Sequence, residues 1–355
     1  MEKKFLKGSE AVAEAAVRAG CRFFAGYPIT PQNELPEYMS ARLPQVGGHF
    51  VQGESEVSSI NMLYGASSVG TRCMTSSSGP GLSLKAEGLS CAIGAKLPLV
   101  IAIMSRGGPG QGEIFPAQQD YLFAVKAPGH GGFKCFVLAP STGQEAVDLT
   151  YRAFDYADKY RTGVIVLGDG VIANTMENIS MPPMRDLSSL PQHNDWKATT
   201  KGPNGERRWI TSYVPGPERL ETENLKMAAM YELWKETEAL HEEFLLDDAE
   251  IVICSYGSSA RICKETIMNL RAEGIKAGMI RPITLHPFPE KPFEKLDYNK
   301  VKKIICIEMS NPGQLIEDVK LCVARRCDVS HYGRSGGVII SPEDIYKAVK
   351  ERTGR

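Results

Sequence analysis

The chain has 355 residues, of which 43% are hydrophobic, so it is long enough for two α/β domains that each bury a core. Its 41 basic and 42 acidic side chains leave a formal net charge of -1, which favours neither nucleic acid nor an anionic membrane surface as a partner. No apolar run approaches the roughly 20 residues that span a bilayer. The sequence also opens on no signal-peptide core, so we expect a cytoplasmic protein.

The nine cysteines are scattered singly through apolar segments, and no C-x-x-C occurs. This pattern is typical of reduced, mostly buried thiols. Zinc and iron–sulfur sites need thiolates clustered at short spacing. We therefore expect no metal site and no iron–sulfur cluster on this chain.

The first half alternates short β-branched runs with helical stretches, which predicts a mostly parallel sheet covered by helices. A helix is expected over 10–19, with Ser9 as its cap and Gly20 at its end. Strands are expected over 23–27, 49–52, 72–75, 97–104, 133–138 and 164–167.

Apolar periodicity then disappears from about 174 to 224, which indicates a long irregular arm, and its length suggests a role at an interface. Helical spacing returns on one face, at Met227, Met230, Tyr231 and Trp234.

A second alternation follows, with strands expected over 251–255, 276–280 and 303–308 and a helix over 259–273. The fold class is therefore α/β, with two three-layer domains at 1–245 and 246–355.

Two glycine-rich segments follow expected strands. Ser76–Gly81 is neither a dinucleotide fingerprint, since Leu84 replaces the third glycine, nor a P-loop, so it is either an anion site or a tight turn that starts a helix. Arg106–Gly112 places Arg106 at the carboxyl end of a strand, where ligands bind in open α/β folds. A guanidinium there suits a carboxylate, and the alternative is a surface arginine on a loop.

Glu54-Ser55-Glu56 follows a short strand and opens a helical run. Acidic residues in a first turn stabilise the helix dipole, and Ser55 could cap the helix. Residue types alone therefore favour a structural role for Glu56 over a catalytic one.

Taken together, these segments closely resemble the alpha subunits of 2-oxoacid:ferredoxin oxidoreductases. The matching motifs are Gly26–Pro31 (GYPITP), Glu54–Glu56 (ESE), Thr75–Gly81 (TSSSGPG) and Arg106–Pro109 (RGGP), and later Tyr256–Ser258, Arg281–Leu285 and Glu308–Gln314. The resemblance implies a thiamine-diphosphate pyrimidine-binding domain followed by a transketolase C-terminal-like domain.

The resemblance also implies an activity. Such enzymes oxidatively decarboxylate a 2-oxoacid, transfer the acyl group to coenzyme A and reduce ferredoxin. Magnesium and the pyrophosphate belong to a beta subunit, iron–sulfur clusters to partner subunits, and gamma and ferredoxin-like delta subunits usually complete the complex. We therefore expect the isolated chain to bind thiamine diphosphate weakly.

Site residues are carried over position by position. Glu56, and not Glu54, matches the catalytic carboxyl group that hydrogen-bonds N1′ of the aminopyrimidine and favours the tautomer that takes the C2 proton. Thr30 and Arg106 match substrate-binding residues, with Arg106 on the substrate carboxylate. The other cofactor-binding positions are Tyr27, Pro28, Ile29 and Gly79.

Gly168-Asp169-Gly170, with Asn194 downstream, has a spacing close to the magnesium motif of thiamine-diphosphate enzymes. The segment between them offers no strand or helix that returns Asn194 to Asp169. We interpret it as a strand end followed by a turn, in agreement with a magnesium site on the beta subunit.

For the substrate, Gly108–Gly112 and Pro116–Tyr121 look more like the branched-chain subgroup than the 2-oxoglutarate one. A second carboxylate needs a second cation, and only Lys126 and His130 are near. A branched tail needs apolar lining, for which the candidates are Ile114, Phe115, Tyr121 and Leu122. We expect 2-oxoisovalerate, with 2-oxoglutarate as the alternative.

Two other classes remain open. A thiamine-dependent decarboxylase without redox partners would share the pyrimidine site, and a non-catalytic assembly module would share the glycine-rich turns. The full-length second domain argues against the first class. The second class leaves the GYPITP and ESE motifs unexplained.

Overall fold

Parallel strands that are buried on both faces are near-continuous apolar runs, and the larger sheet is built from such runs. The computed structural model describes residues 2–126 and 128–354. Its eight-stranded sheet has the order β13-β7-β8-β5-β4-β2-β3, with β6 beside β5. From β7 to β3 all neighbours are parallel, and β6 and β13 are antiparallel. The strands are β2 (Phe23–Gly26), β3 (His49–Gln52), β4 (Cys73–Ser77), β5 (Leu99–Gly107), β6 (Glu113–Pro116), β7 (Phe136–Leu138), β8 (Gly163–Asp169) and β13 (Thr284–His286).

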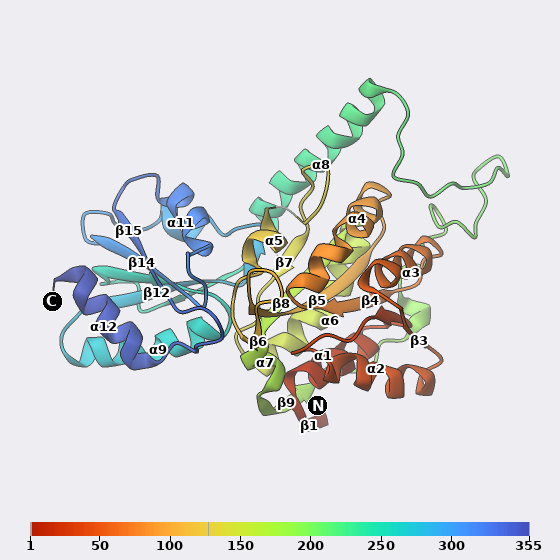
Figure 1. Cartoon of the computed structure of the whole chain (residues 1–355). Helices are drawn as coiled ribbons and strands as arrows, with labels where there is room; N and C mark the ends of the chain where they lie inside the picture. Colours follow the sequence, from red (N-terminus) through yellow and green to blue (C-terminus); the bar gives the residue numbers. More distant parts are fainter. Residues whose placement is uncertain (1, 127, 355) are drawn as a thin grey trace.

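Helices cover both faces of this sheet, as Figure 1 shows. On β5, Ile101 packs with α3, α4 and α5, whereas Val100 packs with α1, α2, α6 and α7. The helices are α1 (Gly8–Arg18), α2 (Glu34–Gln45), α3 (Glu56–Ser68), α4 (Pro80–Gly94), α5 (Tyr121–Val125), α6 (Gly143–Tyr160) and α7 (Gly170–Asn174).

A second sheet of five strands has the order β10-β12-β11-β14-β15, with β10 antiparallel. Helices α9 and α12 pack on one face, and α10 and α11 on the other. The elements are β10 (His241–Phe244), β11 (Ile251–Cys254), α9 (Gly257–Ala272), β12 (Ala277–Pro282), α10 (Lys291–Glu294), β14 (Lys303–Glu308), α11 (Leu315–Val323), β15 (Asp328–Gly333) and α12 (Pro342–Thr353). The expected fold class, two three-layer α/β units, is confirmed.

The expected domain boundary between residues 245 and 246 separates two strands from the sheets to which they belong. Strand β10 precedes it yet belongs to the smaller sheet, whereas β13 follows it yet pairs with β7 of the larger sheet. The two units are therefore linked by exchanged strands as well as by packing. Among the described residues, no helix is long and apolar enough to cross a membrane.

Ser9 does not cap the first helix. The helix begins at Gly8 with Lys7 as N-cap, and the Lys7 N–H donates to Glu10 Oε2 at 2.9 Å. Strand β1 (Glu2–Lys7) leads directly into α1, so the helix starts earlier than its apolar pattern indicates. Gly20 follows the helix with a φ of 94°, and its position after the end was predicted correctly.

The irregular arm is shorter than 174–224. Met176–Met181 forms β9, which pairs with β1 in a two-stranded antiparallel sheet. The other end begins α8 (Pro217–Thr237), whose only buried residue is Trp234. The first turns of α8 carry no apolar periodicity, because Leu220 and Leu225 are five residues apart and both exposed. Between β9 and α8 lies one 3-10 turn, Leu187–Ser189, and α8 extends away from the sheets (Figure 1).

The two units meet across the segment between β6 and α5. The Gln118 side chain donates to the Tyr256 carbonyl at 2.9 Å and accepts from Ser259 Oγ at 2.6 Å and from Met309 N at 2.8 Å. Gln118 is 2% exposed, so these hydrogen bonds are shielded from water. One amide thus ties the loop between β6 and α5 of the first unit to two segments of the second.

We expect Gln118→Leu to lower the free energy of unfolding by about 2–4 kcal/mol, because buried partners that lose a hydrogen bond cost about 1–3 kcal/mol each. Urea unfolding followed by circular dichroism measures the change. The control is Gln45→Leu at an exposed position, which should stay within about 0.5 kcal/mol of the parent. Equal effects of the two substitutions would contradict the role given to Gln118.

Candidate functional site

The expected site residues follow β2, β3, β4 and β5, which lie side by side in the sheet. Because these strands are parallel, their carboxyl ends share one edge, where ligands bind in open α/β sheets. Thr30 follows β2, Glu56 follows β3, Gly79 follows β4 and Arg106 lies near the end of β5. The fold therefore gathers side chains that are up to 76 positions apart in sequence.

Arg106 brings three of these segments together. It is 6% exposed, and its Nη1 donates to the Thr30 carbonyl at 3.0 Å, while Nη2 donates to the Gln111 carbonyl at 2.9 Å. A Cβ on Gly79 would stand 3.3 Å from Arg106 Nε, so the backbone of Gly79 lies against the guanidinium. The sequence-based grouping of Thr30, Gly79 and Arg106 is thus a spatial one.

Glu56 lies at the same edge of the sheet. It begins α3, with Ser55 as the N-cap that accepts from Ser58 N at 3.3 Å, and its side chain is buried. A Cβ on Gly81 would stand 2.6 Å from Glu56 Oε1 and 2.4 Å from Ser77 Oγ. Glycine at position 81 therefore leaves room for the carboxyl group. Glu54, by contrast, is exposed, and its carboxylate accepts from Ser55 Oγ.

Sequence reasoning missed Lys85, which is 1% exposed on α4. Its Nζ donates to the Glu56 carbonyl at 3.5 Å. Burial lowers the pKa of Lys85 to about 8, and the charge of Glu56 acts in the opposite direction. A signal was present, because Leu82, Lys85 and Leu89 follow the spacing of a buried helical face.

Asp120 is the other buried charged group that the sequence did not indicate. Burial raises the pKa of its carboxyl group, while the Ser105 hydroxyl and the backbone N–H groups of Gly79 and Arg106 oppose that shift. Its neighbour Gln119 lines the same cavity as Arg106 and accepts from Gly108 N. The loop tied down by the second unit thus supports the Arg106 strand end.

Several buried polar atoms at this edge have no hydrogen-bond partner in the described residues. They are Gln32 Nε2, Asn33 Oδ1, Thr75 Oγ1, Ser77 Oγ, Ser78 Oγ, Arg106 Nε and Asp120 Oδ2. A buried polar group without a partner costs about 1–3 kcal/mol, so native proteins rarely gather them in one place. Such a cluster fits a polar ligand. The buried carboxyl group of Glu56 beside Gly81 fits a ring nitrogen, as an aminopyrimidine offers.

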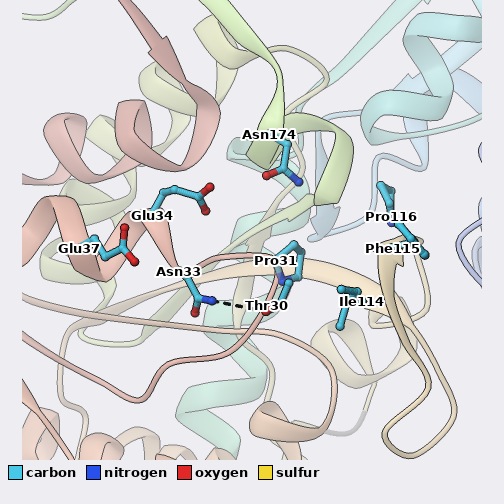
Figure 2. A pocket seen from close by; sticks show the side chains of 9 residues that line it. All are labelled: Thr30, Pro31, Asn33, Glu34, Glu37, Ile114, Phe115, Pro116 and Asn174. Atoms are coloured by element: carbon cyan, nitrogen blue, oxygen red, sulfur yellow. Dashed lines mark hydrogen bonds between the residues drawn. The ribbon is translucent and has the colours of Figure 1, made fainter.

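Two cavities lie beside the hydrogen bond from Arg106 to the Thr30 carbonyl, and Thr30 lines one while Arg106 lines the other. The first, of about 430 Å³, is shown in Figure 2 and is lined by Thr30, Pro31, Asn33, Glu34, Glu37, Ile114, Phe115, Pro116 and Asn174. The second, of about 410 Å³, includes Gly79, Arg106, Asp120, Phe123 and Gln314. Arg106 is the only cation that lines either one in the described part of the chain.

Some expected residues lie elsewhere. Tyr27 and Pro28 are exposed, and Pro28 lines a separate cavity of about 260 Å³ with Gly26 and Gln52. Ile29 is half-buried, and its carbonyl accepts from Gln32 N. These three residues present their surface beside the Arg106 cluster rather than inside it.

Two of the four expected apolar lining residues, Ile114 and Phe115, line the Thr30 cavity, and two do not. Tyr121 is fully buried, and its hydroxyl donates to Asp318 Oδ2 at 2.6 Å. The backbone of Leu122 donates to Gln314 Oε1 at 2.8 Å. Both belong to the contact between the two units, which a sequence motif does not reveal.

Neither candidate for a second cation lines either of these two cavities. Lys126 pairs with Asp318, across the contact between the units. His130 is exposed, and its carbonyl accepts from Ser90 Oγ at 2.6 Å. Both were candidates only by proximity in sequence, and tertiary contacts direct them away.

Asp169 has a structural role. Its Oδ1 caps α7, accepting from Val171 N at 2.9 Å and Ile172 N at 3.2 Å, while Oδ2 accepts from Ser258 Oγ at 2.6 Å. The interpretation of Gly168-Asp169-Gly170 as a strand end is therefore confirmed, whereas the expected turn is wrong, because Gly170 begins α7 directly. Across residues 2–126 and 128–354, no group of three or more His, Cys, Asp or Glu side chains is arranged to hold a metal ion.

Known proteins share this architecture. Residues 14–239 match the family described as "Pyruvate flavodoxin/ferredoxin oxidoreductase, thiamine diP-bdg", and residues 249–345 match "Pyruvate:ferredoxin oxidoreductase core domain II". A "Ketoisovalerate oxidoreductase subunit VorB" of Methanothermobacter marburgensis is 42% identical over all of this chain and 99% of its own length. A "2-oxoglutarate synthase subunit KorA" of Methanocaldococcus jannaschii is 34% identical over 98% of this chain and 100% of its own.

A solved structure agrees with these sequence relatives. The 2-oxoglutarate:ferredoxin oxidoreductase of Magnetococcus marinus, with 2-oxoglutarate, coenzyme A and succinyl-CoA bound, superposes with a TM-score of 0.86 at 27% identity. The match covers 98% of this chain and 65% of that one, so the chain spans about two thirds of the solved relative.

The crowding around Gly81 gives a stability prediction. Gly81→Ala forces the Glu56 carboxyl group and Ser77 to move, so we expect the free energy of unfolding to fall by about 1–3 kcal/mol. The matched control is Gly65→Ala in α3, where no atom lies within 4 Å, and which should gain about 0.5–1 kcal/mol. Urea unfolding compares the two, and a stabilised Gly81→Ala variant would refute the packing argument.

Proposed function

Because this chain belongs to the alpha subunits of the 2-oxoacid:ferredoxin oxidoreductases, we propose that it supplies the pyrimidine-binding half of a thiamine-diphosphate site. The observation that carries this proposal is the buried carboxyl group of Glu56 against Gly81, among polar atoms without partners. The reaction is the oxidative decarboxylation of a 2-oxoacid.

When bound, thiamine diphosphate supplies a carbon nucleophile for the 2-oxo group and an electron sink for decarboxylation. The part of Glu56 is to hold a proton at its carboxyl group, hydrogen-bonded to N1′ of the pyrimidine. Gly81 leaves the space for this contact, and Gly79, Tyr27, Pro28 and Ile29 form the surrounding surface. A beta subunit would supply the magnesium and pyrophosphate site.

Arg106 and Thr30 are the proposed substrate contacts. The guanidinium is already oriented by two backbone carbonyls, and its remaining N–H groups, Nε among them, are available to a carboxylate. Thr30 lines the adjoining cavity, where its hydroxyl accepts from Asn33 Nδ2 at 3.4 Å (Figure 2). The carboxylate of the substrate would thus meet Arg106 while its side chain extends toward Ile114 and Phe115.

The Thr30 cavity favours an aliphatic substrate. Its charged lining residues are Glu34 and Glu37, both acidic, and Ile114, Phe115 and Pro116 provide apolar surface. A second substrate carboxylate would face like charge, and Lys7, which pairs with Glu34 at 2.6 Å, does not line the cavity. The 42% identical relative is named for ketoisovalerate and the 34% identical one for 2-oxoglutarate. We therefore favour a branched-chain 2-oxoacid, 2-oxoisovalerate.

The partners in this proposal are a beta subunit, a gamma subunit and a ferredoxin-like delta subunit, which carry the iron–sulfur clusters, with ferredoxin and coenzyme A as co-substrates. Coenzyme A is named with the Magnetococcus marinus enzyme, and several relatives are named as subunits. The cytoplasm is the proposed location. All nine cysteines are free, in keeping with a reducing compartment.

Glu56→Gln in the assembled complex should lower kcat by about 10²-fold or more, because an amide cannot exchange the proton. Glu54→Gln is the control, since Glu54 is exposed and should keep activity near that of the parent. The measurement is 2-oxoacid-dependent reduction of ferredoxin or a viologen dye. Near-normal turnover by the Glu56 variant would disprove the assignment.

Substrate preference is tested by steady-state kinetics on the complex. We expect kcat/KM for 2-oxoisovalerate to exceed that for 2-oxoglutarate, because the cavity offers apolar contact worth about 0.8 kcal/mol per buried methylene. Phe115→Ala should reduce this preference. A higher kcat/KM for 2-oxoglutarate would reject the branched-chain assignment and leave the family assignment intact.

A further inference from the structure

Lys85 lies where α3 and α4 pack most closely. On α4, Gly81 and Gly88 both touch α3: a Cβ on Gly81 would stand 2.6 Å from Glu56 Oε1, and one on Gly88 would stand 2.4 Å from Ile60 Cγ2. Lys85 lies between these two glycines, four residues after the first and three before the second. Residues at these spacings share one helix face, so Lys85 faces the start of α3.

The amine has little besides Glu56 to bind. Lys85 Nζ donates to the Glu56 carbonyl at 3.5 Å, and within the described residues it makes no other hydrogen bond and no ion pair within 4.0 Å. Its side chain is 1% exposed, so water does not replace the missing partners. A buried ammonium group is costly unless it is paired, and the first turn of a helix repels cations. Packing alone therefore does not account for a lysine here.

The surrounding charges single out one partner. Glu56 on α3 is the charged side chain that acts on Lys85, and it opposes the effect of burial on the lysine. Tyr64, further along α3, donates to the Ile210 carbonyl. Arg106 and Asp120 contact Gly79 at the start of α4: the guanidinium lies against the Gly79 backbone, and the Asp120 carboxyl group accepts from the Gly79 N–H. Lys85 lines neither cavity beside Arg106, so contact with a substrate carboxylate is not its role.

We propose that Lys85 is a positioning residue for Glu56: its ammonium group attracts the Glu56 carboxyl group and anchors the first turn of α3 through the Glu56 carbonyl. The carboxyl group is thereby held where it meets the pyrimidine. This inference rests on the proposed function of Glu56. An ammonium beside a carboxyl group stabilises the ionised form, so loss of the lysine charge changes both the position of the Glu56 carboxyl group and its proton exchange with the pyrimidine.

The test uses the assembled complex with Lys85→Met, which keeps the length and removes the charge, and Lys85→Arg, which keeps the charge. Lys134→Met is the matched control, because Lys134 is partly buried and, like Lys85, donates to a backbone carbonyl, that of Val125. The first readout is calorimetric binding of thiamine diphosphate with magnesium to the cofactor-free complex. We expect Lys85→Met to weaken binding roughly tenfold, and Lys134→Met to leave it unchanged.

The second readout is the pH profile of kcat. Lys85 loses its proton as the pH rises through about 8, so the parent should lose activity on the alkaline side. Lys85→Arg should move this limb to higher pH, because a guanidinium keeps its proton. Lys85→Met should lower kcat roughly 10- to 100-fold, as for residues that orient a reacting group, and abolish the limb.

Parental cofactor affinity and an unmoved alkaline limb in the Lys85 variants would overturn the inference, even if the variants were less stable. If the complex with Lys85→Met fails to assemble, the alkaline limb of the pH profile of Lys85→Arg still tests the inference. Glu56→Gln distinguishes the role of Lys85 from the proposed function of Glu56. An inactive Glu56→Gln together with unaffected Lys85 variants refutes only the role of Lys85, whereas an active Glu56→Gln refutes the proposed function.

Discussion

The parallel pairing of β5, β4, β2 and β3 is the constraint on which the site depends. Parallel neighbours end at the same edge, so the segments after them must meet there, whatever their distance along the chain. Arg106 uses this edge to reach the Thr30 carbonyl, and Glu56 uses it to lie against Gly81. The chemistry is therefore assembled from loops, while the sheet supplies the rigidity that holds them.

The second unit supports this edge and also lines the Arg106 cavity through Gln314. The Gln118 side chain binds this unit through three hydrogen bonds, and the adjoining Gln119 and Asp120 reach Gly108, Gly79 and the backbone of Arg106. A series of hydrogen bonds thus links the segments after β11 and β14 to the backbone of the proposed substrate arginine. This support gives a physical reason for the family motifs that lie in the second unit.

At this edge of the sheet, several buried polar groups have no hydrogen-bond partner within the described part of the chain. Ser77, Ser78 and Gln32 have buried side-chain atoms without partners, and Tyr27 and Pro28 present exposed surface beside them. A monomeric enzyme would normally pair such groups internally. The lack of partners for these groups agrees with a site that is completed by a cofactor and by another subunit, as the family implies.

The sequence by itself determined the features that depend on local pattern. Apolar runs located the strands, with His49–Gln52 and Lys303–Glu308 correct at both ends, and the motifs identified the family. Features with weak local patterns were missed: β9 is a short edge strand, and the first turns of α8 bury no apolar side chain. Strand β13 was also missed, since three residues carry too little periodicity.

Only the tertiary structure decided which side chains at the edge are used. Tyr121 and Lys126 were near the site in sequence, yet both bind Asp318, because the second unit packs on that side of α5. Lys85 is a lysine at a position that a helical pattern would fill with an apolar residue, and its neighbour Glu56 is 29 residues away. Burial and charge pairing arise from contacts between distant segments. A local pattern fixes where a side chain starts, and packing fixes what it meets.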